Sequence, residues 1–160
     1  MKRENRLQTR RAVSAGGVVY RRIAGEVAVL LVETPGGQWG LPKGTPGGDE
    51  KLEEAAVREV VEETGLQVDR EGKIGTIEYW FVRAEEGQRV HKYVHFWLMR
   101  PTGGSIADHD AEHISVRWFS LERGIERATH ENTKTILRKA AALLDAGEAA
   151  FEATGPSDTG

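Results

Sequence analysis

The segment LPKGTPGGDEKLEEAAVREVVEETGLQV, residues 41–68, combines a glycine- and proline-rich loop with closely spaced acidic residues. Residues 35–49 contain six glycines and three prolines, a composition that predicts a loop. Residues 52–64 contain neither, and Gly65 follows at the place where a helix commonly ends in the left-handed conformation. The segment therefore predicts a loop that leads directly into a helix over residues 52–64.

The acidic residues of this helix lie on a different face from its apolar residues. At ~100° per residue, Glu59, Glu62 and Glu63 fall in one arc and are neighbours on the helix surface. The apolar arc contains Ala56, Val57, Val60, Val61 and Thr64. Like charges in this arrangement repel, whereas a shared divalent cation would reverse the sign of the interaction. The alternative interpretation is a solvated acidic helix face.

Nine positions of this segment resemble the signature of the Nudix hydrolase family. In order they are Gly44, Glu50, Arg58-Glu59-Val60, Glu62-Glu63 and Gly65-Leu66. The order of the surrounding strands extends the resemblance across most of the chain. It implies an α+β fold, an α/β/α sandwich with a mixed β-sheet between helices. Lys51 stands where many members have a serine or threonine helix cap, so Asp49 is the candidate cap instead.

The resemblance also assigns roles to these residues. Nudix enzymes hydrolyse a nucleoside diphosphate linked to another group and use Mg²⁺ or Mn²⁺. Carried over to this sequence, Glu59, Glu62 and Glu63 become metal ligands, and Glu59 or a neighbour serves as base for the attacking water. Arg58 is expected to orient Glu50 through charge-assisted hydrogen bonds. These five residues are the expected catalytic group.

A further acidic residue is a candidate metal ligand. Family members often have a glutamate in the loop before the late strand that ends in tryptophan. Glu112 in DHDAEHISVRW, residues 108–118, matches that description. An acidic surface loop is an equally good interpretation, because Asp108 and Asp110 lie nearby.

The residues before the acidic helix bear on the substrate. WGLPKG, residues 39–44, resembles the Nudix branch that acts on diadenosine polyphosphates, and also the branch that acts on diphosphoinositol phosphates. Lys43 is expected to bind a phosphate as a compact ammonium, although a solvated loop lysine is the alternative.

A later strand supplies further candidate substrate-binding residues. In RVHKYVHFWLMR, residues 89–100, alternation places His91, Tyr93 and His95 on one face. That face suits stacking on a base and contact with phosphate, but it also suits an ordinary amphipathic sheet. Arg89, beside the turn, is expected either to reach a distal phosphate or to solvate the loop.

Alternating β-branched and aromatic residues predict strands around the helix, and residues 131–147 have helical spacing. The expected organisation is a flexible basic N-terminal arm over 1–11, one domain over 12–147, and a flexible acidic tail over 148–160. Strands with two separated helices favour a mixed sheet covered on both faces.

The composition limits the possible functions. The 160 residues include no cysteine, which excludes disulfides, thiolate metal sites and a cysteine nucleophile. The net charge of −3 is too small to predict nucleic-acid or membrane binding by bulk electrostatics, and no apolar run is long enough to cross a bilayer. We expect a cytoplasmic protein with a small nucleotide substrate, no nucleic-acid or membrane partner, and an oligomeric state left open.

The leading functional hypothesis is metal-dependent hydrolysis of dinucleoside polyphosphates, such as diadenosine tetra- or hexaphosphate. One alternative is a nucleoside triphosphate pyrophosphohydrolase that removes damaged nucleotides. Another is a Nudix domain that binds a nucleotide as a sensor without cleaving it. Such sensors usually lose signature glutamates or the arginine, and this chain keeps all of them.

Overall fold

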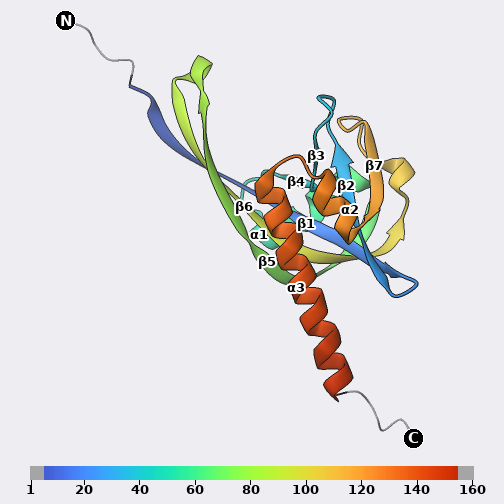
Figure 1. Ribbon diagram of the computed structural model, residues 1–160. Coiled ribbons are helices and arrows are strands. Elements are labelled where there is room, and N and C mark those ends of the chain that lie inside the picture. The colour runs from blue at the N-terminus through green and yellow to red at the C-terminus, as the bar shows by residue number, and fades with distance from the viewer. Residues whose placement is uncertain (1–5, 155–160) are drawn as a thin grey trace, which may run out of the picture.

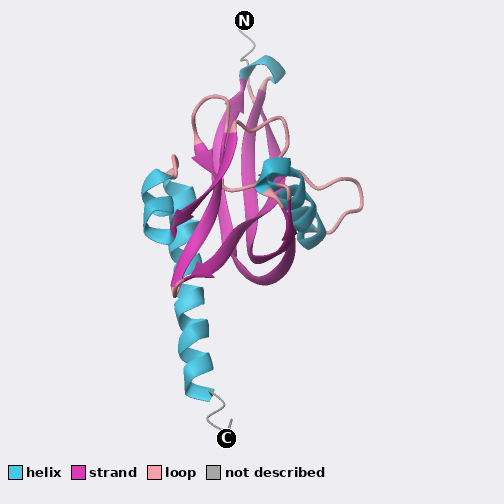
Figure 2. Cartoon of the chain, turned by 90° about the vertical axis from the view of Figure 1, so that its right-hand side faces the viewer, coloured by secondary structure: helices cyan, strands magenta, loops and turns pink. Residues whose placement is uncertain are grey.

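Alternating apolar and polar residues build a mixed β-sheet that lies between helices (Figures 1 and 2). The computed structural model describes residues 6–154. The strands are β1 (Gln8–Ile23), β2 (Glu26–Glu33), β3 (Trp39–Gly40), β4 (Lys43–Gly44), β5 (Leu66–Arg83), β6 (Gln88–Gly104) and β7 (Ser115–Ser120). The α-helices are α1 (Leu52–Thr64), α2 (Leu121–Arg127) and α3 (Glu131–Thr154). Two 3-10 turns, Ala84–Glu86 and Ile106–Asp108, complete the described elements.

The sheet has the order β3-β2-β1-β6-β5, with β4 paired to β1 and β7 paired to β2. β1 and β6 run parallel over residues 8–19 and 88–99, and every other pair is antiparallel. The predicted mixed sheet is therefore confirmed, as is the hairpin that joins β5 to β6.

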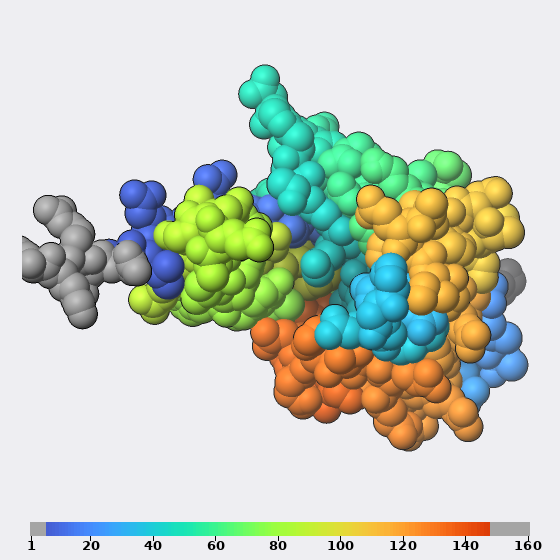
Figure 3. Space-filling view, turned by 90° about the horizontal axis from the view of Figure 1, so that it is seen from above, coloured from blue at the N-terminus to red at the C-terminus, as the bar shows by residue number. Residues whose placement is uncertain are grey.

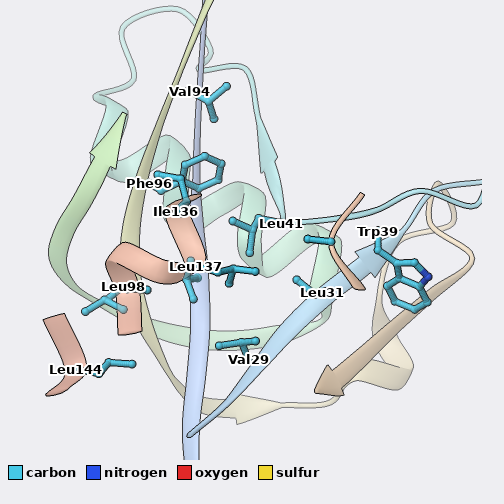
Figure 4. Packing of buried hydrophobic residues seen from close by; sticks show 13 residues of the cluster. Val29, Leu31, Trp39, Leu41, Val94, Phe96, Leu98, Ile136, Leu137 and Leu144 are labelled. Carbon is cyan, nitrogen blue, oxygen red and sulfur yellow. The ribbon is translucent and has the colours of Figure 1, made fainter. Parts of the chain in front are cut away.

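Each face of the sheet packs against its own helices, because successive strand residues point to opposite faces. On one face, Ile136, Leu137 and Leu144 of α3 pack against strand residues such as Phe96 and Leu98 (Figure 4). The other face is covered by α1, which contributes Ala55, Ala56 and Val60 to a second cluster around Trp97 and Met99. The predicted sandwich, with helices on both faces, is confirmed.

The acidic helix α1 has the predicted bounds, and its ends show why. Gly65 has φ 81°, a left-handed conformation that glycine adopts without steric cost, and its N–H donates to the Val61 carbonyl. The residue before the first turn is Lys51, whose N–H donates to Glu54 Oε1 at 3.3 Å. The helix is therefore not capped by Asp49.

Other boundaries differ from the sequence-based expectation. β1 begins at Gln8, so residues 8–11 of the expected N-terminal arm pair with β6. Helix α3 continues past the expected stop at Gly147 to Thr154, which makes the first part of the expected tail helical. Residues 1–5 and 155–160 lie outside the described residues. Among residues 6–154, no helix combines the length and apolar character needed to cross a membrane.

Three strands continue beyond the helices as a projection that we call the three-stranded extension, residues 8–13, 76–83 and 88–95. In Figure 1 it leaves the body near the N-terminus, and in Figure 3 it stands clear of the main mass. Neither α1 nor α3 covers the outer half of the extension. The extension is therefore held together largely by its own cross-strand contacts.

The turn between β1 and β2 yields a stability prediction. Ala24 and Gly25 both have positive φ, 53° and 83°, as a two-residue type I′ hairpin turn requires. Alanine is strained there, whereas asparagine tolerates the conformation. Ala24→Asn is expected to raise the free energy of unfolding by ~0.5–1 kcal/mol, and Ala24→Val to lower it. Urea denaturation measures both, and no difference between the two variants would contradict the prediction.

Candidate active site

One arginine connects the glycine-rich loop to helix α1. Arg58 donates to both carboxylate oxygens of Glu50, at 2.8 and 2.9 Å. The same guanidinium donates to Glu59 and Glu62, each at 2.9 Å. It also donates to the carbonyl of Thr45 at 3.2 Å. The planar fork of an arginine can hold this many acceptors at once, and an ammonium cannot.

This network strongly favours the charged form of Glu50. Hydrogen bonds from Arg58, together with the Gly47 N–H at 3.0 Å, lower the pKa of Glu50 to about 2. The pKa of Arg58 is raised in turn, chiefly by its hydrogen bond to Glu50. The expected pairing of Arg58 with Glu50 is thus present, and it ties the loop to the helix.

Gly44 gives Glu59 the space that its carboxylate occupies. A Cβ atom at position 44 would collide with the Glu59 carboxylate. The loop backbone therefore approaches the acidic helix as closely as a residue without a side chain allows. This close approach explains why the sequence has a glycine at this position.

Glu63 is the most deeply buried acidic residue of the helix, with 8% of its surface exposed. Its Oε1 accepts the Lys43 N–H at 3.3 Å. Burial raises the pKa of Glu63 to about 8, and the charges of Glu59 and Asp110 add to the rise. The positive charge of Lys43 opposes this rise only in part, and a bound cation would favour the charged carboxylate further.

A histidine that the sequence analysis did not single out lies beside Glu63. His113 Nδ1 is 2.8 Å from Asp110 Oδ1, and its Nε2 is 3.7 Å from Glu63 Oε1. His113 and Asp110 both belong to the loop before β7, so this loop reaches the acidic helix. No local sequence signal identifies the histidine, because the contact joins segments about 50 residues apart.

Lys43, Glu63 and His113 border a cavity of about 690 Å³. Its walls come from the β2–β3 loop, the start of α3, the loop before β7 and one face of the β5–β6 hairpin. They include Thr34, Gln38, Trp39, Lys43, Glu63, Ile77, Tyr79, Phe96, Glu112, His113, His130 and Asn132. The mixture of aromatic walls and a few converging polar groups is typical of a small-molecule site.

The structure brings together part of the expected site. Lys43, Glu63 and Glu112 line the cavity. Glu59 and Glu62 lie with Glu50 in the Arg58 network beside it. The placement of Glu112 agrees with a position facing the same cleft as the helix.

The other expected substrate-binding residues lie elsewhere. His91, Tyr93 and His95 share the sheet face of Trp97, which packs toward α1, whereas the cavity is lined by the opposite face through Tyr79 and Phe96. Arg89 lies with them, over the Trp80 ring at 4.5 Å. The structure therefore does not bring these four residues into the cavity. Alternation identified the residues that share a face, but not the face on which the cavity lies.

The acidic residues are not arranged around a single point. Within residues 6–154, no three acidic or histidine side chains are gathered closely enough to hold one metal ion. Arg58 binds one oxygen of Glu59 but both oxygens of Glu62, so Glu62 would have to turn from it to share a cation with Glu63. The donor set itself, carboxylate oxygens next to a buried carboxylate with a raised pKa, fits a hard divalent cation.

Comparison with known families identifies the fold. The family model described as NUDIX domain matches residues 10–139. The chain belongs to the Nudix family. The expectation drawn from the nine signature positions is thus confirmed, and Nudix hydrolases as a group use divalent metals.

Two relatives and one solved structure place the chain within the family. It is 38% identical over 147 residues to a putative mutator protein MutT4 of Mycobacterium tuberculosis, covering 88% of this chain but only 58% of that protein. It is 32% identical to an asymmetrical bis(5'-nucleosyl)-tetraphosphatase of Caenorhabditis elegans, covering 82% and 95%. A crystal structure of a C. elegans Ap4A hydrolase binary complex matches with a TM-score of 0.70 at 27% identity, covering 84% and 98%.

The raised pKa of Glu63 predicts a pH-dependent stability for the metal-free Nudix domain. Its pKa is about 8 in the folded protein, against 4.5 without perturbation, so between these values the folded state binds a proton that the unfolded chain has released. Stability should therefore fall as pH rises, by ~2–4 kcal/mol between about pH 5.5 and about pH 8.5. Urea denaturation in the presence of a chelator measures it.

Glu63→Gln should remove most of this dependence, and the exposed Glu62→Gln should retain it. Adding Mg²⁺ to the wild type at about pH 8.5 should restore stability, since a bound cation favours the charged carboxylate. An equal pH slope in wild type and Glu63→Gln would refute the assignment.

Gly44→Ala tests the packing of Glu59. The new methyl group meets a flexible side-chain end rather than backbone, so the melting temperature should change little. The displaced carboxylate should weaken Mn²⁺ binding by ~10-fold or more, measured by titration calorimetry. Gly47→Ala, in the same loop with no atom closer than 4.0 Å, is the matched control. Equal Mn²⁺ affinity in both variants would contradict a role for Glu59.

Proposed function

We propose that the chain is a Mg²⁺- or Mn²⁺-dependent hydrolase of phosphoanhydride bonds in nucleoside diphosphate-linked compounds, and that its preferred substrates are dinucleoside polyphosphates. The resemblance to the C. elegans tetraphosphatase supports this substrate class. When bound, the metal would neutralise phosphate charge and acidify the attacking water. The protein residues proposed to hold it are Glu59, Glu62, Glu63 and Glu112.

The observation that carries the substrate class is a row of cations that leads from the cavity onto the three-stranded extension. Lys43 lines the cavity, and Lys92 lies on the same sheet face as Tyr79 and Phe96. The pKa of Lys92 is lowered by burial and by the positive charges of Lys43 and Arg83. Cations that repel one another in this way favour a ligand with a long polyanionic chain, because its charges would relieve their repulsion.

Other residues in and around the cavity would position the substrate and the glutamates, or balance their charge. Lys43 would pair with a phosphate as a point charge while its backbone N–H holds Glu63. Arg58 is not among the residues that line the 690 Å³ cavity, and it would act by holding Glu50 and Glu59 in place. The aromatic walls, Trp39, Tyr79 and Phe96, suit the flat surface of a nucleobase.

A second candidate function is the pyrophosphohydrolysis of nucleoside triphosphates. The higher identity to the putative mutator protein, 38%, favours it. A triphosphate would engage the acidic helix and Lys43 but would have no phosphates left to reach Lys92 and Arg83. The two functions therefore differ in how far the substrate extends along the row of cations.

The deciding experiment is incubation with Mg²⁺ and a panel of nucleotides, followed by identification of the products by anion-exchange chromatography. The panel contains diadenosine tetra- and hexaphosphate, ATP and an oxidised purine triphosphate. A preference for the dinucleotides supports the proposal. A preference for the triphosphates would replace it with the second candidate, and no cleavage of any nucleotide would refute both.

The row of cations predicts a substrate-dependent effect of Lys92→Ala. Removing Lys92 should lower kcat/KM for diadenosine tetraphosphate ~10-fold more than for ATP, which corresponds to ~1.4 kcal/mol for one charge-assisted contact. Lys43→Ala should reduce both.

Lys73→Ala is the matched control for Lys92→Ala. Lys73 lies on the same hairpin but beside His95, on the face away from the cavity, and its removal should leave both substrates unaffected. If Lys92→Ala lowered kcat/KM equally for the two substrates, Lys92 would not distinguish polyphosphates by their length.

A further inference from the structure

The three-stranded extension exposes apolar side chains on the face away from the cavity. Among the residues whose burial the structure describes, three exposed large hydrophobic residues lie at or beside its end, and we call them the apolar tip: Leu7, Trp80 and Val82, with 40%, 47% and 55% of their surfaces exposed. Trp80 and Val82 share one face by alternation, and Leu7 lies beside the hairpin end, where the Gln8 N–H donates to Gly87. Clustered exposed apolar residues on a soluble domain indicate an interaction surface.

The same face carries a continuous stack of rings and guanidinium groups, which we call the outer ladder. Trp80 and His91 stack with ring centroids 4.1 Å apart, and His91 lies 4.5 Å from Tyr93. Arg89 lies 4.5 Å from the Trp80 ring centre and Arg11 lies 4.4 Å from that of Tyr93. Cross-strand contacts of this kind stiffen the extension without help from a helix. The apolar tip is thus presented on a rigid support.

Both signs of charge flank this apolar tip. Arg89 and Arg11 lie along the outer ladder, and within residues 6–154 neither forms an ion pair with a carboxylate. Exposed Glu85 lies in the turn at the end of the hairpin, and Val82 stands between that turn and the level of Arg11. Glu85 and Arg11 therefore lie on opposite sides of Val82. Arg89 is level with Val82, and Glu78, which is hydrogen-bonded to His91, lies on the Arg11 side.

We propose that this outer face of the three-stranded extension binds a second copy of the chain. A two-fold axis passing close to Val82 would place the apolar tips against each other. It would also bring Glu85 of each copy toward Arg11 of the other, since a two-fold contact joins opposite ends of one patch. Self-complementarity in charge, with apolar residues at the centre, is what an isologous interface requires.

A single-stranded nucleic acid suits this face less well than a second copy. Stacking of bases needs free aromatic surfaces, and part of the Trp80 ring already contacts His91 and Arg89. The carboxylate of Glu78, whose Oε2 is 2.6 Å from His91 Nε2, would repel a phosphate backbone, and so would the acidic turn. Nucleic-acid binding is therefore an outcome of the test and not the proposal.

Crosslinking through an introduced cysteine tests the axis directly. The chain has no cysteine, so Val82→Cys supplies a single thiol beside the proposed axis. Mild oxidation should convert most of this variant into a disulfide-linked dimer, because two residues near a two-fold axis face each other within disulfide range. Ile23→Cys, 50% exposed and at the opposite end of β1, is the matched control and should remain monomeric. Equal crosslinking of the two variants would overturn the proposed axis.

Sedimentation equilibrium provides the second measurement. The wild type should approach twice its mass of 17.7 kDa at micromolar concentrations. Val82→Glu should weaken the association at least ~10-fold, and Ile23→Glu should not. Arg11→Glu should weaken it, and combining Arg11→Glu with Glu85→Arg should recover it by exchanging the charges. A wild type that stays monomeric overturns the proposal, and if it then binds a fluorescent oligonucleotide through Trp80, the face is a nucleic-acid site instead.

Discussion

The ion-pair network of Arg58 is the interaction on which the candidate site depends. One guanidinium gathers Glu50 from the loop and two glutamates of α1, and it also reaches a loop carbonyl. Without it, the three carboxylates would repel one another, and the glycine-rich loop would lose the ion pair that joins Glu50 to the helix. The arginine thus makes an acidic helix compatible with a folded protein. It also keeps the two helix glutamates, Glu59 and Glu62, close to the loop. Each of them can exchange its hydrogen bond to Arg58 for a bond to a cation.

The features that could be predicted from the sequence have local causes. Helix α1 was predicted with its bounds because glycine and proline stop at one end and Gly65 stands at the other. The sheet, its hairpin and its two covered faces follow from alternation and from the separation of the helices. The fixed spacing of the signature residues predicted the family, and Lys43, Glu63 and Glu112 do line one cavity.

The features that could not be predicted depend on how distant segments meet. Period-two alternation groups His91 with Tyr93 but does not say which sheet face borders the cavity, and four expected binding residues lie on the face opposite the cavity. Helix α2 was missed because Gly124 interrupts its pattern. Its glycine is explained only by packing, since a Cβ atom there would press on Val29. His113 joins the site through a contact that no local pattern signals.

The parallel pairing of β1 with β6 has a consequence for synthesis. Gln8 pairs with Gln88, so during synthesis β1 must wait for most of the domain before its partner exists. Closing so long a loop is slow, and until then residues 12–19, which are apolar and rich in valine and glycine, are an unpaired edge open to association with other chains. Arg10 and Arg11 directly precede that run. Their charges are well placed to act as gatekeepers against aggregation of the nascent chain.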